Sequence, residues 1–508
     1  MNTKPKISSE WIYRFYNELD KYGIENHGLL ITQNGETVFE EYLYPYSADI
    51  PHTLFSVTKS VVSTAVGFAI SEGLFSLDSK ILPFFPEYKA CKSDEWDNMT
   101  VRSLLTMQSN KKFSFTQDMT GNYDEIFMKS AFRKKDKGFF YSNNDVHVIA
   151  SLIQRLSGMN LVDYLTPRLF EPLGIERPFW ETDINNECVG GTGCHLKLRD
   201  LAKICQCYAD GGKYNGVQVI PEEWAKEATK KHVNLEGRES EDGYGYYFWI
   251  DNGAYSMNGM LGQIVMYYPQ YNAIIATSSC VIEDVLFCKL IRTVLTKAFE
   301  NESTDEWDKK LADYLKNRGK KPVVCTEKLK IPENKTYYIT PISDILAGFM
   351  FPASLLPRSL TSSQARRSKK NLNKISFSLS ENVLTIKWFE ENDEIIINCG
   401  LDGNPRLSEC SIKGYTYKIW AYAYIKNGVL NAVIKPLNTL ATQYVTFDFF
   451  DNTLKMKMIG TPSFPTFIYN NAFQSSFVSN SGIFKPIIMQ CVKSILKTTE
   501  MPMKFKAK

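Results

Sequence analysis

A serine and a lysine three positions apart, Ser56 and Lys59, have types and spacing suited to nucleophilic chemistry. The apolar run that follows them as far as Gly73 predicts that they begin a buried helix. Residues three apart share a helical face, with Cβ atoms roughly 5–6 Å apart, so the amine is expected beside the hydroxyl. The positive end of the helix dipole favours negative charge on the serine oxygen. The pair therefore predicts a serine nucleophile.

The spacing alone is weak evidence, because it recurs at Ser109 and Lys112 and at Ser494 and Lys497. Serine is also a common helix N-cap, which is the structural alternative for Ser56. The prediction therefore depends on groups found further along the chain.

Tyr141 and Asn143 stand on an expected turn just before an amphipathic helix. Lysine and tyrosine normally titrate near a pKa of about 10, so neither is a base at neutral pH by default. In a shared cleft, burial lowers the pKa of Lys59, and its charge lowers that of Tyr141. Tyr141, Lys59 or the coupled pair is then expected to act as the base toward Ser56. Asn143 is expected to hold Lys59 and to donate to a substrate carbonyl.

A developing oxyanion needs two N–H donors. The backbone N–H of Ser56 is one candidate, and that of Met260 is the other. Gly259 precedes Met260 on an expected strand and allows a close backbone approach.

With these residues in this order, the chain resembles the serine β-lactamase and penicillin-binding protein family. The nearest resemblance is to its class C-like branch of esterases, D-aminopeptidases and 6-aminohexanoate oligomer hydrolases. Ser56-Val57-Thr58-Lys59 is similar to the family S-x-x-K motif, and Tyr141-Ser142-Asn143 to its Y-x-N motif. The resemblance implies that Ser56 is the nucleophile and Tyr141 a general base or acid. It covers roughly residues 10 to 300 and includes these flanking stretches: 104–107, 170–174, 244–249 and 259–263.

The third family motif, K-T-G or H-x-G, departs from the pattern, because Met257-Asn258-Gly259 occupies it here. In the family this cation commonly meets a substrate carboxylate. Its loss favours esters or amides without that carboxylate over penicillin-like or D-Ala-D-Ala substrates.

Several of these residues also have structural interpretations. The alternative interpretation of Tyr141 is an aromatic residue at a helix entry, and that of Asn143 is a helix cap. Met257 is expected to lie in the core or in the cleft wall. One of Tyr244 and Trp249 is expected to form a wall of the acyl site. We expect three histidines to be structural residues with satisfied hydrogen bonds: His52, His147 and His195. None of them is expected to belong to a conventional catalytic triad.

Composition is that of an ordinary globular protein, with 44% hydrophobic and 23% charged residues. A net charge of +3 gives no reason to expect nucleic acid or a membrane as partner. The 11 cysteines show no C-x-x-C metal pattern, and we expect them to be reduced, which favours a cytoplasmic location. No secretory leader is evident at the polar first ten residues. Neither metal nor organic cofactor is expected, and the oligomeric state is left open.

The resemblance implies an α/β (α+β) protein with a β-lactamase/transpeptidase-like catalytic domain, an antiparallel sheet flanked by helices, over residues 1–300. Residues 301–330 are expected to be a linker containing one exposed helix. Residues 331–508 carry short alternating runs at intervals of about ten residues, which predicts a β-rich domain.

The predicted function is hydrolysis of an ester or amide, in a small molecule or short peptide, through a Ser56 acyl-enzyme. Two alternatives stay open. One is a catalytically idle penicillin-binding or ligand-sensing protein, and the other is a D-amino acid peptidase.

Overall fold

The computed structural model describes most of the chain, and it divides into two compact units, Met1–Arg318 and Gly319–Lys508. The described residues are 7–112, 122–134, 138–235, 241–319, 331–333, 335–348, 355, 372–390, 393–412, 414–440, 442–461, 463 and 501–507.

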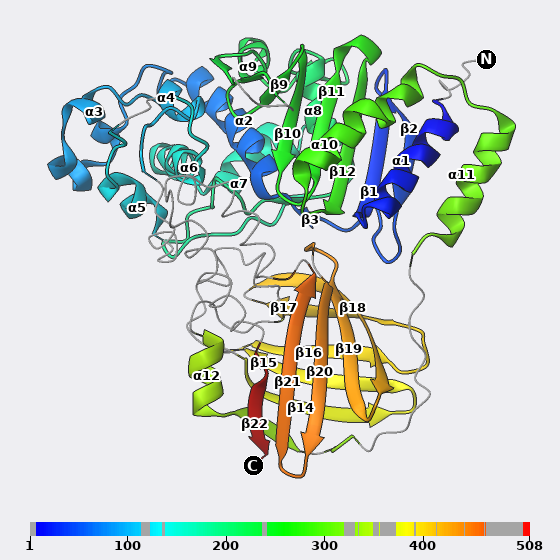
Figure 1. Ribbon diagram of the computed structural model, residues 1–508. Helices are drawn as coiled ribbons and strands as arrows, with labels where there is room; N and C mark the ends of the chain where they lie inside the picture. The colour runs from blue at the N-terminus through cyan, green and yellow to red at the C-terminus, as the bar shows by residue number, and fades with distance from the viewer. Residues whose placement is uncertain are drawn as a thin grey trace, which may run out of the picture. The chain divides into compact units, whose positions relative to one another are not determined.

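The first unit is built on an antiparallel sheet with the strand order β2-β1-β12-β11-β10-β9-β8-β7 (Figure 1). Its strands are β1 (Glu25–Gln33), β2 (Glu36–Tyr42), β7 (Val233–Asn234), β8 (Gly243–Tyr244), β9 (Trp249–Asp251), β10 (Ala254–Gly259), β11 (Gln263–Tyr268) and β12 (Ala273–Cys280). The hairpin between β1 and β2 turns at Asn34 and Gly35, whose φ angles of 53° and 78° suit the Asn-Gly signal.

Successive residues of a strand face opposite sides of the sheet, and each side of this sheet supports its own apolar core. Leu29 and Ile31 of β1 pack into one core, and Leu30 packs into the other. The core with Leu29 involves α1 (Ser9–Lys21), α10 (Asp284–Thr293) and α11 (Asp305–Asn317). The core with Leu30 involves α2 (Thr58–Ser71), α4 (Val101–Leu105), α5 (Tyr123–Lys129), α6 (Asn143–Ser157), α7 (Leu161–Leu165), α8 (Leu198–Ala209) and α9 (Glu222–Ala228).

Helix α2 lies inside this second core, because every residue from 58 to 69 is buried. A helix that is apolar nearly all round is stable only in such a position. The sequence prediction of a central helix after Ser56 is therefore confirmed.

The aromatic stretch 243–250 includes β8 and the start of β9, which are joined by a turn in which Tyr247 adopts φ 65° and the Gly245 N–H donates to Phe248 O at 2.8 Å. The linker predicted over residues 301–330 overlaps the first unit, which extends to Arg318, and α11 buries Leu311 against the core that contains α1. Residues 320–330 lie outside the described residues.

The second unit is β-rich and barrel-like, with the order β16-β15-β14-β13-β22-β21-β20-β19-β18-β17 and a further pairing of β16 with β18. Inward-facing residues such as Ile386, Trp388 and Phe447 form its core. Its elements are β13 (Thr336–Ile339), α12 (Pro341–Gly348), β14 (Leu372–Ser380), β15 (Val383–Glu390), β16 (Asp393–Gly400), β17 (Arg406–Ile412), β18 (Tyr415–Lys426), β19 (Val429–Pro436), β20 (Thr442–Phe450), β21 (Thr453–Thr461) and β22 (Met503–Ala507).

The predicted fold class, a helix-flanked antiparallel sheet followed by a β-rich region, is confirmed. Among the described residues, none of the helices has the length and apolar character needed to cross a bilayer.

Candidate active site

Ser56 lies in a 3₁₀ turn, Phe55–Val57, that leads directly into α2. The helix expected to begin at Ser56 therefore begins at Thr58. Phe55 has φ 46°, a left-handed conformation that bulky residues rarely adopt, so the backbone bends sharply just before Ser56. Ser56 remains partly accessible, whereas Lys59 is 1% exposed.

The Lys59 ammonium group contacts three oxygens. Its Nζ donates to Ser56 Oγ at 2.8 Å, to Asn143 Oδ1 at 2.7 Å and to Gly191 O at 2.7 Å. These contacts join α2, the start of α6 and a loop more than a hundred residues away in sequence. Ser56, Lys59 and Asn143, predicted as one site from the sequence, are therefore brought together.

Burial lowers the pKa of Lys59 well below its usual 10.5, because desolvation disfavours the charged form. A neutral amine has two N–H donors and one lone pair. Asn143 Oδ1 and Gly191 O can accept the two N–H bonds, which leaves the lone pair for the Ser56 hydroxyl. This arrangement is chemically that of a general base beside a nucleophile.

The ring of Tyr141 lies beside Lys59. Lys59 Nζ lies 4.9 Å from the centre of the Tyr141 ring. The ring stacks on Trp249 with a centroid distance of 5.3 Å, and Phe139 and Tyr244 pack around both. Tyr244 is buried, whereas Trp249 is only partly buried. Trp249 therefore forms an aromatic wall beside the phenol ring of Tyr141.

Asn143 is the first residue of α6 but does not cap it. Ser142 is the N-cap, and its Oγ accepts from the Asp145 N–H at 3.2 Å. The Asn143 amide is therefore available for Lys59, and the alternative interpretation of Asn143 as a helix cap is wrong.

Gly259, at the end of β10, lies against the backbone around Ser56. A Cβ at this position would lie 2.3 Å from Leu54 O and 3.2 Å from Val57 N, so only glycine fits. Met260 follows in the turn and is partly buried. The turn is held by Asp284, whose Oδ2 accepts from the Leu261 N–H at 3.3 Å. The role of the Met260 N–H as an oxyanion donor stays a prediction.

Sequence reasoning missed Gly191, whose carbonyl holds Lys59. A Cβ on Gly191 would lie 2.9 Å from both Asn143 Cβ and Asn143 O. The available signal was the Gly190-Gly191 pair, since paired glycines often mark a close backbone approach. Nothing local in the sequence assigned that approach to α6.

The position of the third family motif carries no cation. Met257 is 1% exposed and packs in the core, as expected. The pair Ser109 and Lys112 does not reproduce the site, because Ser109 is buried whereas Lys112 is exposed. Ser494 and Lys497 lie outside the described residues.

The three histidines predicted to be structural differ in their hydrogen bonding. His52 and His195 are buried with hydrogen-bonding neighbours, and the described hydrogen bonds join Ser56 to Lys59 rather than to an imidazole. The expectation for His147 is wrong, because its Nε2 is buried without a hydrogen-bond partner. It belongs to a separate group with Asp124 and Glu187.

Comparison with known proteins gives several similar proteins. A 6-aminohexanoate-dimer hydrolase of Paenarthrobacter ureafaciens is 23% identical over 284 residues, 49% of this chain and 71% of that protein. The D-amino acid amidase of Ochrobactrum anthropi SV3 has 18% identity and a TM-score of 0.47, over 57% of this chain and 98% of that one. An octameric penicillin-binding protein homologue from Pyrococcus abyssi has 14% identity and a TM-score of 0.46, over 88% and 97%.

The family model described as Beta-lactamase covers the unit that contains the Ser56 site. It matches residues 14–316, more than half of the chain, and the chain therefore belongs to the beta-lactamase family.

Proposed function

We propose that this chain is a serine hydrolase that cleaves an ester or amide bond through an acyl-enzyme on Ser56. The observation that carries the proposal is the 2.8 Å hydrogen bond between Lys59 Nζ and Ser56 Oγ, at a lysine whose pKa is lowered by burial. Membership of the beta-lactamase family supports it.

In the proposed acylation, neutral Lys59 takes the hydroxyl proton while Ser56 Oγ bonds to the substrate carbonyl carbon. The N–H groups of Ser56 and Met260 hold the oxyanion. The bond to the leaving group then breaks, and Tyr141, coupled to Lys59, passes the proton to the departing oxygen or nitrogen.

In the proposed deacylation, water attacks the acyl carbon and gives a proton to the same pair. The acyl–Oγ bond breaks, Ser56 regains a proton, and the carboxylic acid leaves. The Asn143 amide keeps Lys59 directed at Oγ through both steps.

The walls of the site favour a substrate without a carboxylate at the third-motif position. Met257 supplies no charge there, and the partly exposed ring of Trp249 offers an apolar surface beside Tyr141. Small esters, linear amides and short peptides fit this description. The name of the aminohexanoate-dimer hydrolase supports the amide class.

Because Met257 replaces the cation of the third motif, a second function stays open. This is an idle penicillin-binding or ligand-sensing protein that is acylated and turns over slowly. A D-amino acid peptidase is the third. Rates with p-nitrophenyl butyrate, nitrocefin and D-alanine amides, together with fluorophosphonate labelling, separate the three.

The test compares the wild type with Ser56→Ala and, as a matched control, Ser109→Ala, which removes the serine of another Ser-x-x-Lys pair. We expect turnover and labelling in the wild type and the control, and neither in Ser56→Ala. Labelling without turnover would support the sensor. Labelling that persists in Ser56→Ala would overturn the proposal.

A cytoplasmic location is proposed as well. The buried Cys188, Cys194 and Cys205 form no disulfide, as is usual in a reducing compartment. Fractionation of cells that make the full-length chain checks it, and recovery from the secreted fraction would contradict it.

A further inference from the structure

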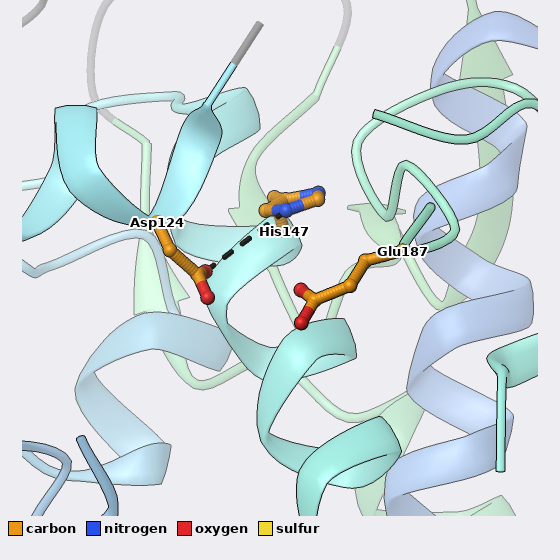
Figure 2. A group of neighbouring side chains, drawn as sticks. All are labelled: Asp124, His147 and Glu187. Carbon is orange, nitrogen blue, oxygen red and sulfur yellow. Dashed lines mark ion pairs between the residues drawn. The ribbon is translucent and has the colours of Figure 1, made fainter. Parts of the chain in front are cut away.

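A second group of polar side chains lies in the first unit, apart from the Ser56 hydroxyl. Asp124 comes from α5, His147 from α6, and Glu187 from the segment after α7 (Figure 2). Figure 2 shows the two carboxylates and the imidazole around one common space. One ligand atom from each lies within 4.8 Å of the other two.

The atoms of this group that lack partners are buried. Asp124 Oδ1, His147 Nε2 and Glu187 Oε2 make no hydrogen bond. Asp124 is 3% exposed and His147 is 1% exposed. Buried polar groups are normally satisfied, and leaving one unsatisfied is destabilising. Three together indicate a missing partner of opposite charge.

The spacing suits an ion better than hydrogen bonds. His147 Nε2 lies 3.9 Å from Asp124 Oδ1 and 3.8 Å from Asp183 Oδ2, too far for a hydrogen bond. Two ligand atoms each about 2.0–2.3 Å from a shared cation lie at comparable separations from one another.

The charges also fail to balance. Asp124, Asp183 and Glu187 contribute three carboxyl groups, and the adjacent described cation is Arg155, 3.4 Å from Asp124 and shared with Glu87.

We propose that Asp124, His147 and Glu187 bind a divalent transition-metal cation, with Asp183 beside it. The mixed imidazole and carboxylate set favours Zn²⁺ or Mn²⁺, whereas Ca²⁺ and Mg²⁺ take oxygen ligands. The proposal is independent of the hydrolase function.

Binding has one structural consequence. The Gly190 N–H donates to His147 Nδ1 at 3.4 Å, so without a metal the ring proton lies on Nε2. A metal replaces that proton, and the neutral ring then carries its proton on Nδ1, which releases the Gly190 N–H.

The test is calorimetric titration of Zn²⁺, and separately Mn²⁺, into the full-length chain after EDTA treatment and dialysis. The variants are Glu187→Gln and His147→Asn. The control is His232→Asn, which removes another histidine 3.7 Å from a glutamate carboxylate, Glu227. Thermal unfolding of each metal-free protein verifies that it folds.

We expect one ion per chain, bound about 100-fold more weakly by Glu187→Gln and His147→Asn and unchanged by His232→Asn. Should a variant fail to fold, zinc-edge anomalous scattering from crystals of the wild type gives the second readout. No binding, or binding that both site variants retain, would overturn the proposal.

Discussion

Lys59 and Lys111 are two buried lysines of the first unit with different surroundings. Lys59 is 1% exposed and contacts the hydroxyl of Ser56 together with two acceptors. Lys111 is 4% exposed and donates to Ser130 O at 2.9 Å. Its ammonium lies 4.1 Å from the ring of Trp96 and 4.0 Å from that of Phe132.

Burial lowers the pKa of both lysines, that of Lys111 to about 8. Aromatic faces and backbone carbonyls can stabilise an ammonium but cannot exchange a proton with it. The neighbouring hydroxyl of Ser56 can. The comparison teaches that desolvation prepares a lysine to act as a base, and that the adjacent group decides whether it does.

The largest expected effect comes from replacing each of the two lysines in turn. Lys59→Met removes the proposed base and should lower kcat/KM at least 10³-fold, by analogy with losses at catalytic residues that act as a unit. Lys111→Met should leave kcat/KM within about threefold, because no reacting atom contacts it. Ester hydrolysis by both variants, with circular dichroism to verify folding, checks this. Equal losses would contradict the distinction.

Tyr141→Phe should have the next largest effect, a loss of about 10²-fold in kcat, since general acid–base groups contribute roughly 10²–10⁴-fold. The phenylalanine ring preserves the stacking on Trp249 and so isolates the hydroxyl. Pre-steady-state kinetics separate acylation from deacylation. Unchanged rates for both steps would remove Tyr141 from the proton path.

Asn143→Ala should lower kcat about tenfold, because Lys59 loses one acceptor but keeps Gly191 O and Ser56 Oγ. The matched control is Asn144→Ala on the next position of α6. An equal effect of both changes would indicate general damage to the helix rather than loss of the Lys59 contact.

The smallest expected effect is on stability, and it tests whether burial lowers the pKa of Lys111. With a folded pKa of about 8 and an unfolded value of 10.5, Lys111 binds more protons in the unfolded state between these pH values. Its contribution to the free energy of unfolding therefore rises from pH 8 to 10.5.

Urea unfolding of the wild type and Lys111→Met across this range measures the difference. We expect it to change by about 1–3 kcal/mol, since one pKa unit corresponds to about 1.4 kcal/mol. A difference that is constant with pH would show that the pKa of Lys111 is not lowered.

Local patterns explain what the sequence could predict. Ser56 and Lys59 are three residues apart, so helical geometry alone places the amine at the hydroxyl. The Asn34-Gly35 turn and the alternating strands of the second unit, for example Val383–Glu390, depend on equally local signals. Family motifs linked Tyr141 and Asn143 to this pair.

Long-range contacts explain what it could not. Gly191 lies 132 residues from Lys59, and no periodicity pairs them. The ring cage around Lys111 draws on Trp96 and Phe132, which approach only when their segments fold together. The unsatisfied Nε2 of His147 likewise depends on three separate elements.

The pKa of Lys59 itself is the most direct test of the account. The full-length chain labelled with [ε-¹³C]lysine is titrated by NMR, and the Lys59 signal is assigned from its loss in Lys59→Met. The account predicts a midpoint well below 10.5. A midpoint at or above 10.5 would leave Ser56 without a base at neutral pH and would contradict the central claim.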